Sequence, residues 1–323
     1  MKRSLLIAAL STVAAGSALA QSTVTVYGRL NETVERQKDA AGDSKTVLAD
    51  NASRLGFKGT EDLGGGLKAN FLIEHRFNAD TGTTNGDFWS GDSWVGLSSN
   101  MGELRLGRLT SAAYYATADY VSMHNHDTGS SADTLYNLGF QSWFNKNKIS
   151  YTTPSLGGAT VEVQSALGEG TAERGLEVAV NYALGDLALG AGFTDQGDNR
   201  QVALRALYTL GAFTFGGYYQ RTMFEDYATT TLGGAPFSEG KANIIRLSGM
   251  YALGASEFHA NVGLAGKIDG VADTGAKQYT LGYNYNLSKR TKVYTYFTKV
   301  AADSATPYVS DFSSLALGVR HNF

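Results

Sequence analysis

Short turns recur along this chain between segments of alternating polarity. Each interval between successive turns is long enough for two strands and one further loop. The seven turns are Leu63-Gly64, Met101-Gly102, Leu156-Gly157, Leu184-Gly185, Leu210-Gly211, Leu253-Gly254 and Leu287-Ser288. If both chain ends lie on the side of these turns, the chain forms eight up-and-down hairpins and therefore sixteen strands. Bacterial single-chain membrane barrels have an even number of strands, with short turns on the periplasmic side and longer loops outside.

The strand segments alternate with a period of two. Residues 279, 281, 283, 285 and 287 are Tyr or Leu, whereas residues 280, 282, 284 and 286 are Thr, Gly or Asn. Alternation alone does not say which face points outward. A closed barrel of sixteen strands is too wide for side chains to fill, so its polar face must line water and its apolar face must meet lipid. The sequence therefore predicts an all-β fold, a 16-stranded antiparallel transmembrane β-barrel.

The N-terminus predicts an exported protein. A basic start at Lys2 and Arg3, an apolar run and the small-residue site Ala18-Leu19-Ala20 are typical of a cleaved signal peptide over residues 1–20. We expect residues 21–323 to form a single barrel domain. Without the signal, acidic side chains exceed basic ones by about five, which argues against a nucleic-acid partner. The absence of cysteine excludes a disulfide framework and a thiol nucleophile.

One long segment, residues 109–145, has no strand pattern. It contains no Lys, Arg or Glu, and its formal charges are Asp119, Asp127 and Asp133. A long patternless segment in a compact protein is usually functional or disordered. We expect this third extracellular loop to fold into the barrel and narrow the pore, with Ala112–Ala118 forming a short helix.

Four segments resemble the general porins of Gram-negative bacteria, especially the β-proteobacterial type. They are STVTVYGRLNETVE at 22–35, SRLGFKG at 53–59 followed by EDLG at 61–64, GELRLGR at 102–108, and LALGVRHNF at 315–323. The resemblance implies a homotrimer of outer-membrane channels for the passive diffusion of small hydrophilic solutes and ions. It also implies that Phe323 is an assembly signal for the barrel-assembly machinery. Outer-membrane lipid and lipopolysaccharide are further expected partners.

The resemblance also implies a row of basic residues opposite acids on the third loop. The matching bases are Arg54 and Arg108, with Arg29 as a third on the first strand. Where a further family arginine is expected, this chain has Phe144, and Lys146 and Lys148 are candidates to replace it. Strand parity adds Arg76 to the basic wall, and places on lumen faces Lys58, Lys68, Arg205, Arg246, Arg320, Glu74, Glu162 and Glu177. The excess of Arg and Lys predicts a weak preference for anions, because fixed charges bias the ions that a pore admits.

Arg108 conflicts with strict alternation. It shares the phase of Leu104 and Leu106, which would point it at lipid, unless Gly107 breaks the period. The alternative is an arginine that extends its side chain to the membrane interface.

Other functions remain open at this point. A substrate-selective channel for small anions would use the same wall, and an adhesin or structural barrel would need no pore. His124, His126 and Asp127 stand close enough to suggest metal ligands, but the pattern has no third partner, so we expect no metal or other cofactor. The few histidines lie in no recognisable nucleophile motif, and we therefore expect no enzyme activity.

Overall fold

The computed structural model describes residues 22–119, 121–123, 129–137, 146–170, 173–225, 239–269, 271–306 and 309–323. The predicted signal peptide lies outside these residues. The strands are β1(Thr23–Lys38), β2(Ser44–Asp50), β3(Arg54–Gly64), β4(Leu67–Asn78), β5(Thr83–Thr84), β6(Ser93–Ser99), β7(Gly102–Arg108), β8(Lys148–Thr152), β9(Ala159–Ala166), β10(Gly175–Leu184), β11(Leu187–Gln196), β12(Asn199–Leu210), β13(Phe213–Glu225), β14(Glu239–Leu253), β15(Ser256–Ala265), β16(Ala276–Asn286), β17(Thr291–Ala302) and β18(Phe312–Asn322).

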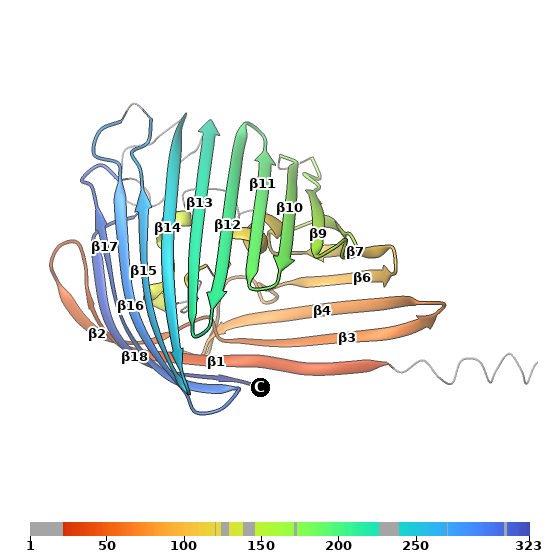
Figure 1. The fold of residues 1–323 in the computed structure, drawn as a ribbon, viewed down its shortest axis with the longest axis horizontal. Helices are drawn as coiled ribbons and strands as arrows, with labels where there is room; N and C mark the ends of the chain where they lie inside the picture. The colour runs from red at the N-terminus through yellow and green to blue at the C-terminus, as the bar shows by residue number, and fades with distance from the viewer. Residues whose placement is uncertain are drawn as a thin grey trace, which may run out of the picture.

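These strands form one closed antiparallel sheet (Figure 1). The first and last strands pair from Arg29 opposite Asn322 to Lys38 opposite Ser313, which joins the two edges. β2 and β3 both pair with β1 and together make a single span, interrupted at 51–53, where Ala52 has a φ of 59°. β5 pairs only with the end of β4. The predicted barrel of sixteen spans is therefore confirmed.

The seven predicted turns all join neighbouring strands at one end of the barrel. For example, Leu184 pairs with Leu187 and Leu253 pairs with Ser256 across two of them. Among the described residues, no helix is long and apolar enough to cross a membrane.

The alternation of the strands sorts side chains between lumen and exterior as predicted. On β16, Tyr279, Leu281 and Tyr285 are exposed on the outer wall, while Thr280 and Asn284 are buried inside. Closed sheets have no edge that would leave backbone groups unpaired in hydrocarbon. The apolar outer face therefore suits lipid.

The seam between β1 and β18 depends on Gly28. Its N–H donates to the Phe323 carbonyl, and the Phe323 N–H donates back, both at 3.1 Å. The Phe323 ring lies directly over this glycine, because a Cβ on Gly28 would stand 2.4 Å from the ring Cζ and 2.5 Å from the Arg54 carbonyl oxygen. A side chain at position 28 therefore cannot coexist with the docked terminal ring.

Gly28→Val is expected to lower the temperature at which the barrel unfolds, because overpacking typically costs about 1–3 kcal/mol and here acts on the closing seam. The shift from folded to unfolded gel mobility during heating measures it. Gly249→Val is the matched control, since a Cβ on Gly249 of β14 meets no atom within 4 Å. Equal melting of the two variants would contradict the importance of the seam.

Candidate pore constriction

The described parts of the third loop lie inside the barrel. They contain α2(Ala112–Thr117), η1(Gly129–Ser131) and η2(Thr134–Asn137). The helix α2 contacts β10, β11 and β12, η2 contacts β15 and β16, and η1 contacts β17. Glycines make room for it, because a Cβ on Gly190 of β11 would stand 1.7 Å from the Ala116 carbonyl oxygen. The predicted short helix and the inward course of these parts of the loop are present.

Glu177 of β10 holds the start of α2 against the wall. Its carboxylate accepts hydrogen bonds from the Ser111 hydroxyl at 2.7 Å and the Ala113 N–H at 3.3 Å. It also forms an ion pair of 3.1 Å with Lys148, and the two side chains are 1% and 0% exposed. We call this group the Glu177 anchor. The loop covers the Lys148 ammonium group in this structure, and a role of Lys148 in the pore wall stays a prediction.

A second anchor, on the far side of the loop, uses Asp133. Its carboxylate is hydrogen-bonded to the Arg246 guanidinium, and both side chains are 2% exposed. Gln278 strengthens this contact by accepting the Thr134 N–H at 3.0 Å and donating to the Ala132 carbonyl at 2.6 Å. Asp133 therefore fastens the loop to the wall with a buried ion pair, and its predicted role as a constriction acid stays a prediction.

A third anchor involves Glu35, which is not among the predicted site residues. Its carboxylate accepts hydrogen bonds from the hydroxyls of Ser130, Tyr296 and Ser314 at 2.6–2.8 Å. The sequence carried a signal for it, because Glu35 shares the lumen phase of Arg29 on the same strand.

The other predicted loop acids are Asp119 and Asp127. Asp119 is buried beside Arg205, which donates to its carbonyl at 3.5 Å. Asp127 lies outside the described residues, as do His124, His126 and Phe144.

Three of the predicted bases lie side by side on adjacent strands, away from the wall that carries α2. Arg29 of β1 stands opposite Arg54 of β3, and Arg54 stands opposite Arg76 of β4. Glu74 forms ion pairs with two of them, 3.8 Å from the Arg54 guanidinium and 3.1 Å from that of Arg76. The side chains of Arg54 and Arg76 are 20% and 36% exposed. We call Arg29, Arg54 and Arg76 the arginine row.

Hydrogen bonds to the second loop, which connects β4 to β6, link Arg108 to the region of the arginine row. Gly107 has a φ of 145°, and the Arg108 Nε donates to the carbonyls of Ser90 and Gly91 at 3.1 and 3.0 Å. Gly91 in turn donates its N–H to the carbonyl of Glu74. Gly107 does adopt the unusual conformation that a break in the period requires. A direct role of Arg108 in the constriction stays a prediction.

Lys146 lies apart from the arginine row. It forms an ion pair of 2.8 Å with Asp87 of the second loop, and its side chain is 67% exposed. The hydrogen bond from this ammonium lowers the pKa of Asp87. The contact joins the end of the third loop to the second loop, and a role in the constriction stays a prediction.

Tyr115 is the half-exposed aromatic residue of α2. The charges of Arg76, Asp92 and Asp119 act on its hydroxyl group. Desolvation inside the barrel, followed by the Asp92 carboxylate, raises its pKa to about 12. Its hydroxyl is therefore neutral at physiological pH and adds no charge to the channel.

Comparison with known proteins agrees with this architecture. Residues 6–305 match the family described as Gram-negative porin. Outer membrane porin protein 32 of Delftia acidovorans is 36% identical over 91% of this chain and 88% of that protein, and an outer membrane porin of Bordetella pertussis is 27% identical over the whole of both.

Among solved structures, the anion-selective porin from Comamonas acidovorans superposes with a TM-score of 0.80 at 30% identity, covering 94% of this chain and all of that one. These relatives are porins and not enzymes. The resemblance that the four sequence segments indicated is thus confirmed, and the chain belongs to the Gram-negative porin family, whose barrels form channels for small solutes in the outer membrane.

Proposed function

We infer that this porin conducts small hydrophilic solutes and ions by passive diffusion with a weak preference for anions. The observation that supports the preference is the arginine row, which faces a loop whose described acids are buried or paired. Asp133 is bound to Arg246 and Asp119 is buried, so Glu74 is the acid that most directly offsets the three arginines. The relative named as anion-selective agrees with this direction.

The preference is weak for a physical reason. A unit charge about 8 Å from a permeating ion contributes roughly 2 kcal/mol at an effective dielectric constant of 20. Salt at physiological strength screens charge over about the same 8 Å. Such a field biases the flow of ions without excluding cations. The wall therefore differs from a selective ion-binding site.

The proposal extends to assembly. The active form is a homotrimer in contact with lipopolysaccharide, exported with residues 1–20 removed, and Phe323 presents the terminal strand to the barrel-assembly machinery. We propose no catalytic activity, no cofactor and no nucleic-acid partner for this protein. One solved structure of the same fold, OmpT of Vibrio cholerae, is described in a trimer form, at 16% identity.

Single-channel recording in planar bilayers tests the proposed function. We expect mature protein to insert with conductance steps in groups of three that rise linearly with KCl concentration, because an open water-filled pore has no saturable site. A zero-current potential across a KCl gradient gives the sign of the selectivity.

The same recording separates the alternatives. Conductance that saturates with a small anion such as phosphate would favour a substrate-selective channel. A barrel that shifts its gel mobility on heating but passes no current would contradict the channel and favour an adhesin or structural role.

A further inference from the structure

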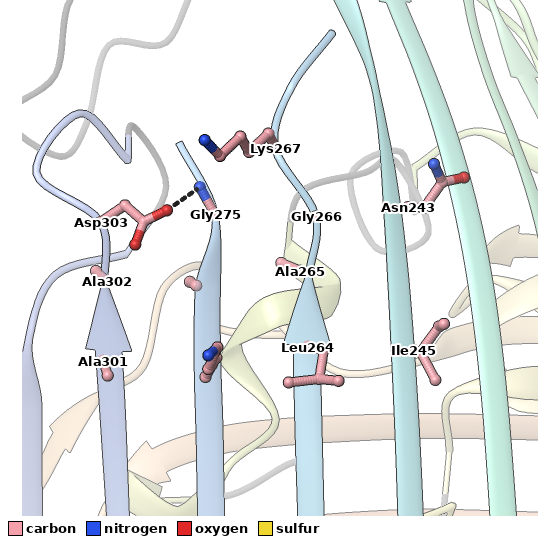
Figure 2. A pocket seen from close by; sticks show the side chains of 12 residues that line it. Asn243, Ile245, Leu264, Ala265, Gly266, Lys267, Gly275, Ala301, Ala302 and Asp303 are labelled. Atoms are coloured by element: carbon pink, nitrogen blue, oxygen red, sulfur yellow. Dashed lines mark hydrogen bonds between the residues drawn. The ribbon is translucent and has the colours of Figure 1, made fainter. Parts of the chain in front are cut away.

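Two hollows in the barrel wall lie on opposite faces of the sheet. One is at the loop end of β14 to β17 (Figure 2), and two residues that line it, Ile245 and Leu264, are exposed on the lipid-facing phase. The other has a volume of about 390 Å³ and opens to the lumen, because its side chains share the phase of the arginine row on β3 and β4. We call it the vestibule pocket, and its lining includes Lys58, Thr60, Asn70, Leu72, Trp94 and Glu103.

The vestibule pocket lies beside the arginine row, on the side of the short turns. Lys58 and Leu72 pair across β3 and β4, and each is four residues from the arginine of the row on its own strand, or about 13 Å. The Tyr27 ring lies between the two sites, because a Cβ on Gly56 would stand 2.3 Å from its Cζ. The Tyr27 hydroxyl donates to Glu74 at 3.1 Å. One continuous wall therefore leads from the arginine row to the pocket.

The floor of the vestibule pocket is apolar. Leu72 of β4 pairs with Trp94 of β6, and both side chains are partly exposed. Every other lumen-phase side chain of β3, β4, β6 and β7, four strands that the structure describes in full, is polar, charged or glycine. The Arg105 guanidinium lies 5.5 Å from the centroid of the Trp94 ring and supports it. This wall thus presents one apolar patch to the water of the lumen.

The neutral polar groups of the pocket already bind one another. The Thr60 hydroxyl donates to the Asn70 amide oxygen at 2.9 Å. The Asn70 amide nitrogen donates to Ser98 at 2.9 Å and to Glu103 at 3.0 Å. The Glu103 carboxylate also lies 3.8 Å from the Arg105 guanidinium. These contacts leave few hydrogen bonds for a sugar or another polyol.

Lys58 is the charged group that stays available to a ligand. Its side chain is exposed, its ammonium lies 5.3 Å from the Tyr27 ring centroid, and no carboxylate of the described chain forms an ion pair with it. Lys58, Leu72 and Trp94 form one lateral row on strands about 4.8 Å apart, so the row is roughly 10 Å long. That length suits a carboxylate joined to a single ring by a short chain.

We propose that the vestibule pocket binds small aryl-substituted carboxylates, with the carboxylate on Lys58 and the ring on Leu72 and Trp94. Ligand pockets are mostly apolar, with a few polar groups that fix orientation. An inorganic anion would use Lys58 alone, and a neutral polyol would find the amide network occupied. The inference rests on the proposed function, because solutes reach this pocket through the lumen, and it adds a class of solute that the wall retains.

A ligand-detected NMR titration of the folded protein in maltoside detergent tests the proposal, with empty micelles as the baseline. The probes are 3-phenylpropionate, propionate, which lacks the ring, and 3-phenylpropan-1-ol, which lacks the charge. We expect 3-phenylpropionate to bind at least about fivefold more tightly than either, because it alone meets both the ammonium and the apolar floor.

Three variants assign the contacts. Lys58→Gln should remove the advantage of 3-phenylpropionate over the alcohol, and Leu72→Thr should remove most of its advantage over propionate. Lys68→Gln is the matched control, because it removes a lumen-phase charge from the same wall, four residues from Leu72, and does not line the pocket. We expect it to bind all three probes like wild type.

Equal binding of 3-phenylpropionate and propionate would overturn the inference, as would unchanged binding by Lys58→Gln. A loss in Lys68→Gln as large as that in Lys58→Gln would also overturn it, since the attraction would then come from lumen charge in general. Heat-shifted gel mobility shows that each variant barrel is folded. Binding is measured without current and the proposed channel by conductance in KCl alone, so a failure of one is distinguishable from a failure of the other.

Discussion

Replacing Arg54 and Arg76 together by glutamine is expected to abolish or reverse the anion preference of the channel. The change leaves Arg29 as the last base of the arginine row, and Glu74 has then lost both of the ion pairs that it forms with Arg54 and Arg76. At about 8 Å, each lost charge is worth roughly 2 kcal/mol before screening and somewhat under 1 kcal/mol after it. Because each charge attracts anions and repels cations, the permeability ratio should fall about tenfold for each charge removed and about a hundredfold for the pair, since 1.4 kcal/mol corresponds to a factor of ten. The zero-current potential across a KCl gradient measures this ratio directly.

Lys58→Gln with Lys68→Gln is the matched control. These lysines lie on the same two strands, β3 and β4, and on the lumen phase, but four and eight residues from Arg54 and Arg76 toward the short turns. At about 3.3 Å per residue, the nearer one is roughly 13 Å away along its strand, which exceeds the Debye length in physiological salt. We expect a much smaller shift. If both double variants shift the potential equally, selectivity belongs to the whole lumen and not to the arginine row.

The strands and turns of this barrel were predictable from sequence because both signals are local. A period of two and a short turn fix where a strand lies and which side chains share its face. The break between β2 and β3 was not predictable, since Ala52 adopts a positive φ with no glycine to mark it. Tertiary pairing of both pieces with β1 keeps them in one span despite this break.

Only the arginine side of the proposed constriction was predictable from the sequence, and the contacts of the third loop were not. Parity identifies Arg29, Arg54 and Arg76 as lumen residues, and they do lie side by side, with Arg54 and Arg76 partly exposed and Arg29 6% exposed. Parity equally identifies Lys148 and Arg246 as lumen residues, but it does not say that the third loop lies over them. In the structure the Asp133 carboxylate of the loop binds Arg246, and Lys148 is buried under the loop beside Glu177 of the wall, and both contacts join residues far apart in the sequence.

Glu177→Gln is expected to make the channel noisy and, on average, wider. The amide oxygen can still accept from Ser111 and Ala113, but the NH2 group then faces the Lys148 ammonium, so the substitution removes the charge and the hydrogen-bond acceptor that Glu177 offers to Lys148. Lys148 then keeps its hydrogen bond to the Gln164 amide oxygen at 2.7 Å but loses the Glu177 carboxylate as its ion-pair partner, and its side chain is 0% exposed. Breaking a buried ion pair from one side costs about 3–5 kcal/mol. The strand ladders on both sides of β10 are unaffected, so the least costly response is for α2 to leave the wall and admit water to Lys148.

Two further variants decide whether the charge is responsible. Lys148→Met combined with Glu177→Gln removes both charges and retains the acceptor for Ser111. We expect this double variant to restore a quiet channel, because a buried pair can be replaced by neutral groups at little cost.

Glu162→Gln on the neighbouring strand breaks the ion pair with Arg105, whose side chains are about one fifth exposed. It should have a small effect, because solvated ion pairs contribute little to stability. Wild type, Glu177→Gln, Lys148→Met and the double variant form a cycle, and their open-channel noise and mean conductance isolate the coupling between Glu177 and Lys148. A double variant as noisy as Glu177→Gln would show that the loop is held by the shape of the Glu177 side chain, and a quiet Glu177→Gln channel would show that the anchors at Asp133 and Glu35 are sufficient without it.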